Sequence, residues 1–272
     1  MIIPALIGLF AGIVGGLLGV GGSIVVIPAM IIYMRDISGF SGSDYHLIFG
    51  MAMISNFFVA TASVIFHGKA NAIVKPVVWW LIPSAVVLTL VGVWISNLPL
   101  LAGENGKYLG MMLGLFLFYV AAYNYSRLKK DNHDTVEMSA DKVNIPGAIC
   151  SGSVMGIVAG ALGIGGGAVC VPMQQFLLKM PLKNAIANSA ATIVPLAFFG
   201  AIYKNATLFE KHGVTLTRSL LLASSIVPTA IVGSFIGAKL VHLISPITLR
   251  IIFICFMIIM GCVTLYQTTF NT

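Results

Sequence analysis

The stretch Gly8–Pro28, GLFAGIVGGLLGVGGSIVVIP, is apolar, uncharged and rich in glycine. A close copy, GIVAGALGIGGGAVCVP, occupies Gly156–Pro172. At an offset of 144 residues, ten of seventeen positions are identical: Gly12, Ile13, Val14, Gly16, Leu18, Gly19, Gly21, Gly22, Val25 and Pro28 fall on Gly156, Ile157, Val158, Gly160, Leu162, Gly163, Gly165, Gly166, Val169 and Pro172. These ordered identities predict an internal duplication. Each copy has an apolar segment, a glycine cluster and a second apolar segment that ends in proline.

The glycine clusters predict a break in each copy. One glycine inside a helix costs about 1 kcal/mol relative to alanine, so three or four in five residues should interrupt it. Within a membrane, such a break is tolerated where the freed backbone faces protein or a polar cavity. The second half-helix should then begin near Ser23 in one copy and near Gly167 in the other. Helix N-termini attract anions, and two of them near the bilayer midplane are typical of secondary transporter sites.

Close helix packing is the alternative role for these glycines. Gly8, Gly12 and Gly16 have the small-xxx-small spacing that lets two helices approach each other, and we expect them to pack in this way. For Gly19–Gly22 and Gly163–Gly167 the interpretation as a break is favoured over packing. The pattern leaves open whether each broken unit is re-entrant or crosses the membrane twice.

The composition predicts an all-α, multi-pass membrane protein, and the location that we expect for it is a bacterial-type cytoplasmic membrane. Of 272 residues, 58% are hydrophobic and 8% are charged, against about 25% charged in soluble domains. Apolar runs of spanning length predict about 8–10 membrane segments. We divide the chain into a first repeat (1–126), a polar linker (127–144) and a second repeat (145–272).

The net charge of +7 comes from basic residues in short loops, so no nucleic-acid partner is expected. If each broken unit crosses once, the halves are parallel and the 15 Lys and Arg divide nine against six. If it is a hairpin or crosses twice, the halves are inverted and the division is ten against five. The ten are Lys69, Lys75, Arg127, Lys129, Lys130, Lys142, Lys179, Lys183, Lys239 and Arg250; the five are Arg35, Lys107, Lys204, Lys211 and Arg218. The stronger bias favours inverted repeats with a cytoplasmic linker and both termini outside.

Ionisable residues inside the apolar spans are almost absent. Those nearest to the spans are placed at their predicted ends: Asp44, His46, His67, Lys69, Lys204 and Lys239. A membrane-embedded protease or a metal transporter is therefore disfavoured, and no cofactor and no metal are expected. Any proton coupling should involve the substrate itself or a span-end residue, with His67 and Lys69 as the nearest candidates. The four cysteines lie in apolar segments and are expected to be small buried residues.

Neutral polar groups and helix N-termini remain as the predicted anion site. The expected backbone donors are at Gly21, Gly22, Ser23, Gly165, Gly166 and Gly167, and the expected side chains are those of Asn56, Asn188, Ser189 and Thr192. Asn188 and Thr192 are four residues apart and share a helix face. Hydrogen bonding between helices is the alternative role of each side chain. We find no catalytic set and expect a protein that is not an enzyme.

The two glycine–proline units and the stretch Ala185–Tyr203, AIANSAATIVPLAFFGAIY, resemble the sulfite exporter TauE/SafE family, also called the toluene sulfonate uptake permease family. Asn188 and Ser189 stand where the family usually has Thr and Ser. In the first half, Met51–Met53 replace this polar pair, so its role there is in doubt or passes to Ser55 and Asn56.

The resemblance covers nearly the whole chain and implies a secondary transporter, often an exporter, of small sulfur-containing anions such as sulfite or organosulfonates. A carrier of another small organic anion and a non-transporting membrane assembly factor stay as alternatives. The expected partners are a small anionic substrate and the lipid bilayer. A homodimer, the exact substrate, the direction and the coupling ion are left open.

Overall fold

The computed structural model describes residues 2–38, 42–98, 106–128, 144–212 and 215–270, which form ten helices and no strand. The first half contains α1 (Ile2–Leu18), α2 (Ser23–Ser38), α3 (Gly42–Lys69), α4 (Lys75–Ser96) and α5 (Gly106–Leu128). The second half contains α6 (Ile145–Leu162), α7 (Gly167–Leu177), α8 (Leu182–His212), α9 (Leu216–Leu243) and α10 (Pro246–Phe270). The predicted all-α architecture is confirmed, and most of the predicted linker lies outside the described residues.

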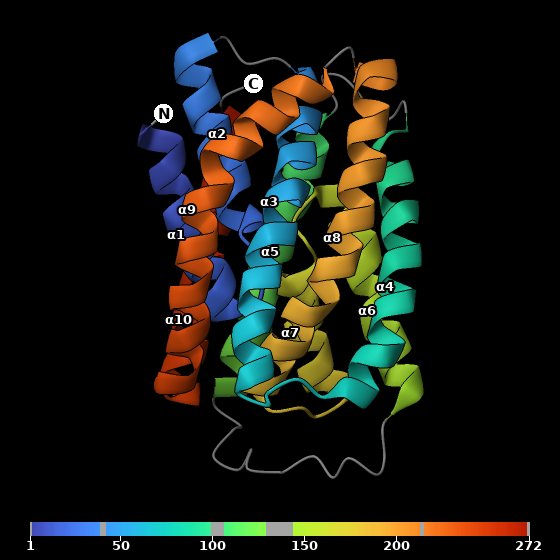
Figure 1. Ribbon diagram of the computed structural model, residues 1–272, viewed down its shortest axis with the longest axis vertical. Coiled ribbons are helices and arrows are strands. Elements are labelled where there is room, and N and C mark those ends of the chain that lie inside the picture. The colour runs from blue at the N-terminus through green and yellow to red at the C-terminus, as the bar shows by residue number, and fades with distance from the viewer. Residues whose placement is uncertain (1, 39–41, 99–105, 129–143, 213–214, 271–272) are drawn as a thin grey trace.

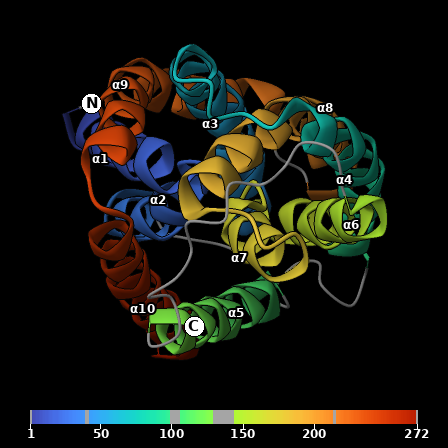
Figure 2. The ribbon, with the colours of Figure 1, turned by 90° about the horizontal axis from the view of Figure 1, so that it is seen from below.

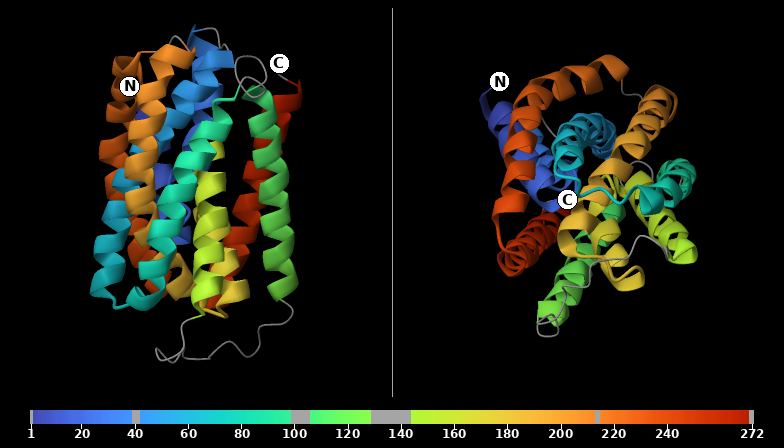
Figure 3. Two further views of the ribbon diagram at one scale, coloured as in Figure 1. Left: turned by 90° about the vertical axis from the view of Figure 1, so that its right-hand side faces the viewer. Right: turned by 60° about the horizontal axis from the view of Figure 1, so that its bottom comes forward.

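Each glycine cluster breaks a helix where the sequence predicts it. α1 ends at Leu18 and α2 begins at Ser23, while α6 ends at Leu162 and α7 begins at Gly167. Figure 1 shows α1 running inward from the upper end of the molecule and α2 returning to that end. In the second half, α6 runs inward from the lower end and α7 returns to it (Figures 1 and 3). Both broken units are therefore re-entrant hairpins.

Within the described residues, six helices are long and apolar enough to cross a membrane: α3, α4, α6, α8, α9 and α10, in the ranges Asp44–Lys69, Lys75–Ser96, Ile145–Leu162, Leu182–Leu208, Leu216–Leu243 and Pro246–Tyr266. Of these, α6 turns back into α7, although its 18 residues reach spanning length. The shorter apolar helices α1 and α2 form the other hairpin. The protein is therefore a multi-pass integral membrane protein.

The most extensive helix contacts join the two halves of the chain. α1 packs along α9, α6 packs along α4, α3 packs on α8, and α5 packs on α10. Seen from below, the inner arms α2 and α7 of the two hairpins lie between the pairs α1–α9, α4–α6 and α5–α10 (Figure 2). Because each half supplies one helix to every pair, the core lies between the halves rather than within either one.

Glycines on the outer arms of the hairpins make this packing close. A Cβ atom on Gly12 would overlap the carbonyl oxygen of Ala230 in α9, and one on Gly156 would overlap that of Ala85 in α4. Gly8 and Gly16 meet α9 in the same way. The predicted packing role of these spaced glycines is confirmed, because only glycine lets the two backbones approach so closely.

The cysteines differ from the prediction. Cys170 is buried, but Cys150, Cys255 and Cys262 are exposed on the helix surface. Their helices are apolar on the outer face as well as inside, as expected when the surroundings are lipid. An apolar sequence context in a membrane protein therefore does not indicate burial within the protein.

Candidate functional site

The two hairpin tips meet at the centre of the fold. Gly19 and Gly21 in the first tip, and Gly163, Gly165 and Gly166 in the second, have positive φ angles of 63–73°. This left-handed conformation is readily adopted only by glycine, and it reverses the chain within four residues. A Cβ atom on Gly167 would overlap the backbone of Gly19 and Val20. The second glycine cluster thus permits both the chain reversal and the contact between the tips.

Asn56 of α3 fills the space between the two tips. Its Oδ1 atom accepts a hydrogen bond from the backbone N–H of Ser23 at 2.9 Å, and its Nδ2 atom donates to Ser23 Oγ at 2.8 Å. A Cβ atom on Gly21 would lie 2.6 Å from Asn56 Oδ1, and one on Gly165 would lie 2.5 Å from Asn56 Nδ2. Asn56 therefore caps the N-terminus of α2 while it contacts the second tip.

The N-terminus of α7 has a different environment. Its first residue is preceded by Gly166, which has no side chain that could cap the helix. Gly166 instead packs on its own hairpin, because a Cβ atom there would lie 2.6 Å from Met155 Cγ in α6. Gly22 has more room, with the nearest atoms of Ala11 and Val59 at 3.4 Å from an added Cβ. Of the predicted glycines, Gly21 and Gly165 are therefore those that line the space around Asn56.

The predicted side chains of α8 reach two different places. Ser189 Oγ donates to the carbonyl oxygen of Gly19 at 2.7 Å, so it lies at the first tip. Asn188 points toward α7 and the start of α4. Its Nδ2 atom donates to Gln174 Oε1 at 3.1 Å, and its Oδ1 atom accepts from the N–H of Val74 at 2.8 Å. Thr192 donates to the carbonyl oxygen of Asn188 at 2.8 Å.

Buried Cys170 joins these polar groups in the first turn of α7. Gln174 Nε2 lies 3.0 Å from Cys170 Sγ and 3.3 Å from the carbonyl oxygen of Ala185. Gln174 thus links α7 to α8 through its contacts with Ala185 and Asn188. The structure brings Gly21, Ser23, Asn56, Gly165 and Ser189 together at the tips. It places Asn188 and Thr192 in this neighbouring network.

Two buried polar clusters were missed by the sequence interpretation. Near the upper end, Lys204 Nζ lies 2.8 Å from His46 Nδ1, 2.9 Å from Ser96 Oγ and 2.8 Å from Asn97 Oδ1. The Lys204 side chain is only 1% exposed, although its residue was predicted to lie at a span end. Lys204 is eight residues before the end of α8, which continues well beyond the predicted span.

The second cluster joins α3, α8 and α9 near the lower end. His67 Nδ1 lies 3.1 Å from His242 Nε2, and Lys183 Nζ lies 3.5 Å from the carbonyl oxygen of His242. His67 is fully buried, and its imidazole also interacts with the backbone of Gly16 near the end of α1. His67, one of the predicted candidates for proton coupling, thus has a histidine partner. Lys69, the other candidate, is exposed.

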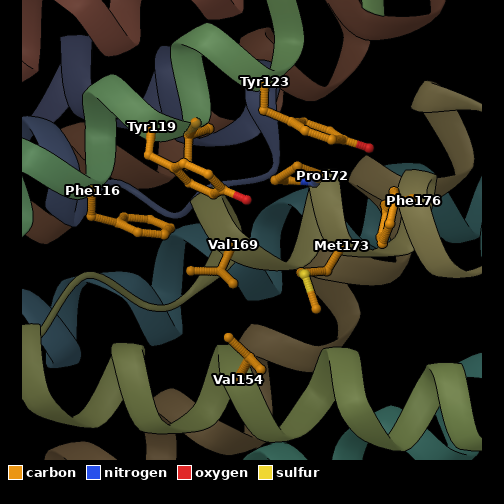
Figure 4. Close-up of a pocket in the computed structure, with 9 residues that line it drawn as sticks. Phe116, Tyr119, Tyr123, Val154, Val169, Pro172, Met173 and Phe176 are labelled. Carbon is orange, nitrogen blue, oxygen red and sulfur yellow. The ribbon is translucent and has the colours of Figure 1, made fainter.

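A pocket of about 320 Å³ lies at the outer side of the second hairpin. Figure 4 shows Phe116, Tyr119 and Tyr123 of α5 on one side, and Val154 of α6 with residues of α7 on the other. Tyr119 is 68% exposed, so the pocket opens to the outer surface. Its aromatic and aliphatic lining suits an apolar group better than an anion. None of the predicted site residues lines it.

Comparisons with known proteins agree with this architecture. The chain is 27% identical to the "Probable membrane transporter protein MJ0441" of Methanocaldococcus jannaschii, over 96% of this chain and 94% of that protein. It is 24% identical to the "Probable membrane transporter protein YunE" of Bacillus subtilis, over 99% of both.

The chain is also 26% identical to the "Probable membrane transporter protein MamO" of Magnetospirillum gryphiswaldense, over 88% of this chain. It spans only about two fifths of the length of that relative, because the match covers 40% of MamO. No solved structure is significantly similar to the chain. The family model described as "Sulfite exporter TauE/SafE" matches residues 4–264, and the protein therefore belongs to the TauE/SafE family of membrane transporters.

Proposed function

We propose that this transporter moves a small sulfur-containing oxyanion, such as sulfite or an organosulfonate, outward across the membrane. The substrate would bind where the two hairpin tips meet. The observation that carries this proposal is the convergence of both tips on Asn56, with the first turn of α2 on one side and Gly165 on the other. Neutral donors and helix N-termini can bind an anion without a full opposing charge.

When the substrate binds, it would replace Asn56 as the hydrogen-bond acceptor at the first tip. In the structure, its Oδ1 atom accepts the hydrogen bond from the N–H of Ser23 at the N-terminus of α2. A substrate oxygen would replace this neutral acceptor, while the displaced Asn56 amide could turn its Nδ2 donor toward the anion. Hydrogen bonds to a charged acceptor are roughly twice as strong as neutral ones, so the exchange favours an oxyanion over a neutral solute.

The two halves are proposed to be inverted repeats. Their hairpins open toward opposite ends (Figure 1). The contacts between the halves also match: α1–α9 is equivalent to α6–α4, and α3–α8 and α5–α10 each join two equivalent helices. A substrate held between two such repeats becomes accessible from either side when one repeat rocks against the other. The basic residues predicted for the cytoplasmic side, such as Lys69, Lys75 and Lys183, belong to helix ends at the lower end of Figure 1. This supports an orientation in which the lower end is cytoplasmic.

Binding and transport can be tested separately. Purified protein in detergent would be heated with sulfite, sulfate, sulfoacetate or taurine, and its thermal stabilisation recorded. A ligand at one hundred times its Kd should add about 2.7 kcal/mol to the free energy of unfolding. Asn56→Ala should abolish this stabilisation, whereas Gln175→Ala, at another buried amide in the last turn of α7, serves as the control. Vesicles loaded with the stabilising anion then report its movement.

The expected result is stabilisation by at least one sulfur oxyanion, loss of the effect in Asn56→Ala, and efflux from loaded vesicles. If acetate, added as a carboxylate probe, stabilises the protein and no sulfur oxyanion does, the substrate is another organic anion. Equal stabilisation of the wild type and Asn56→Ala would show that the anion does not bind at the hairpin tips. An absence of both binding and efflux for every probe would refute the proposed substrate class.

A further inference from the structure

The contacts between the halves reveal which residues correspond in the two repeats. A Cβ atom on Gly19 would meet Ile186 of α8, and one on its repeat partner Gly163 would meet Phe49 of α3. Residues of α3 therefore correspond to residues of α8 that lie 137 positions later. The equivalent contacts of Gly12 with Ala230 and of Gly156 with Ala85 relate α4 to α9 at a separation of 145 positions.

At these separations in sequence, residues of one buried polar cluster correspond to residues of the other. His46 corresponds to Lys183, His67 corresponds to Lys204, and Asn97 corresponds to His242. Two of these pairs follow from the α3–α8 separation and the third from the α4–α9 separation. The two separations are independent, and both relate the same two clusters. One basic cluster thus lies at each end of the fold, at equivalent positions of the two repeats. Buried ionisable groups at membrane depth are costly and mark functional positions by default.

The upper cluster is centred on the side chain of Lys204. Lys204 Nζ contacts three acceptors, Asn97 Oδ1, Ser96 Oγ and His46 Nδ1, which matches the three N–H donors of an ammonium group. His46 can accept through Nδ1 only while that nitrogen carries no proton. The neighbouring ammonium charge opposes a second positive charge on His46. The upper cluster therefore joins a lysine to one histidine, whereas the lower cluster joins two histidines.

The lower cluster contains a pair that must change with protonation. A hydrogen bond between His67 Nδ1 and His242 Nε2 needs one nitrogen with a proton and one without. When both rings are protonated, both nitrogens are donors and the bond is lost. The groups that face the pair are Lys183 from α8, which adds repulsion to a charged His242, and the backbone of Gly16 from α1.

We propose that His67 and His242 form a proton-binding site that controls access from the lower end of the transporter. Protonation of both rings, by protons taken from the water on that side, breaks the hydrogen bond between α3 and α9, beside the end of α1, and opens this end of the molecule. The Lys204 cluster contains no such histidine pair, so the opposite end does not open in this way on acidification. This role in transport rests on the proposed function, but the opening itself can be measured without substrate.

A buried thiol provides the measurement. Ser63 is 1% exposed and lies one turn before His67 on the same face of α3, so Ser63→Cys reports the opening. Ala70→Cys, at the exposed end of the same helix, reports the intrinsic reactivity of a thiol at each pH. Both are made with the four native cysteines replaced. Labelling by a small thiol reagent is compared at about pH 7.5 and pH 5.5, the range in which a histidine exposed to water in the open state changes charge.

Acidification should raise the labelling of Ser63→Cys relative to Ala70→Cys by at least about tenfold, which corresponds to about 1.4 kcal/mol in the opening equilibrium. Adding His67→Gln or His242→Gln should remove this rise, because glutamine does not titrate. His46→Gln, the matched change in the upper cluster, should leave it intact. A buried pair with a purely structural role predicts no such change in access. Persistence of the acid response in both glutamine variants would overturn the proposal.

A transport measurement provides the second test of the proton site. In vesicles, the efflux of sulfite by the wild type should depend on pH at the lower end only, and His67→Gln should flatten this dependence while transport continues at neutral pH. If the wild type moves no sulfite but Ser63→Cys still responds to acid through His67, the proposed substrate fails and the proton site stands. If sulfite moves but neither access nor transport depends on the histidine pair, the proton site fails alone.

Discussion

Replacement of Gly21 by alanine tests the central site most directly. Gly21 has a φ angle of 73°, and the added Cβ atom would lie 2.6 Å from Asn56 Oδ1. A non-glycine residue in this conformation costs about 1–2 kcal/mol. The displaced Asn56 side chain would also lose two hydrogen bonds to Ser23, each worth about 0.5–1.5 kcal/mol. We therefore expect the first tip to be destabilised by about 2–5 kcal/mol.

Gly22→Ala is the matched control. Gly22 lies in the same loop, has no positive φ angle, and would place its Cβ atom at 3.4 Å from the nearest atoms. Its effect should stay within about 1 kcal/mol, since a compatible Gly→Ala change also restricts the unfolded chain. The assay is thermal unfolding in detergent with and without sulfite, followed by efflux from vesicles. Gly21→Ala should lose both stability and sulfite-dependent stabilisation, and Gly21→Val should abolish transport while the protein still inserts.

The reasoning is refuted if Gly21→Ala binds sulfite and transports it like the wild type. It is also refuted if Gly22→Ala produces the same loss, because a general intolerance of the loop would then explain both results. A loss of stability with unchanged sulfite affinity would leave Gly21 as a folding residue and would separate the tip from the substrate site.

Other changes test other parts of the structure. Gly156→Leu should prevent tight α4–α6 packing and cost at least about 1–3 kcal/mol in thermal unfolding, whereas Gly68→Ala, with no atom within 4 Å of the added Cβ, should be neutral. Lys204→Met should lower stability by about 1–3 kcal/mol for each buried acceptor left without a donor, and stability equal to the wild type would contradict the assigned network. Asn188→Ala should weaken sulfite binding about tenfold if its amide contacts the anion; a stability loss with unchanged affinity would assign Asn188 to the network with Gln174 alone. In intact cells, an impermeant thiol reagent should label Thr217→Cys, at the start of α9, and spare Ala70→Cys; the reverse pattern would invert the proposed orientation.

The fold was largely predictable because its determinants are local or repeated. The glycine clusters set both helix breaks, and the segments that start at Ser23 and Gly167 begin as predicted. Spaced glycines such as Gly12 and Gly156 mark packed faces. The sequence did not distinguish a re-entrant hairpin from two crossings, because the direction of α2 after the break depends on its packing partners.

The site was only partly predictable, because its side chains act across helices. Asn56 was a candidate from its polarity, but its capping of Ser23 depends on how α3 crosses the first tip. The Lys204 cluster was missed because the length of the apolar run places Lys204 near the end of a span. Its burial depends on contacts with α3 and α4, which the sequence does not reveal. One signal was present in the sequence. The separation of His67 from Lys204 equals that of Phe49 from Ile186, but the contacts of Gly19 and Gly163 were needed to identify this separation as meaningful.

The pairing of helices across the two halves has a consequence for biosynthesis. The closest partner of α1 is α9, which begins at Leu216 and leaves the ribosome roughly 200 residues later. At 5–20 residues per second, α1 waits on the order of 10–40 s for its partner. During this time its glycine-rich face must be covered by lipid, the insertion machinery or a chaperone. A first half made alone would keep that face uncovered, so co-expression of the two halves as separate chains should rescue each from degradation.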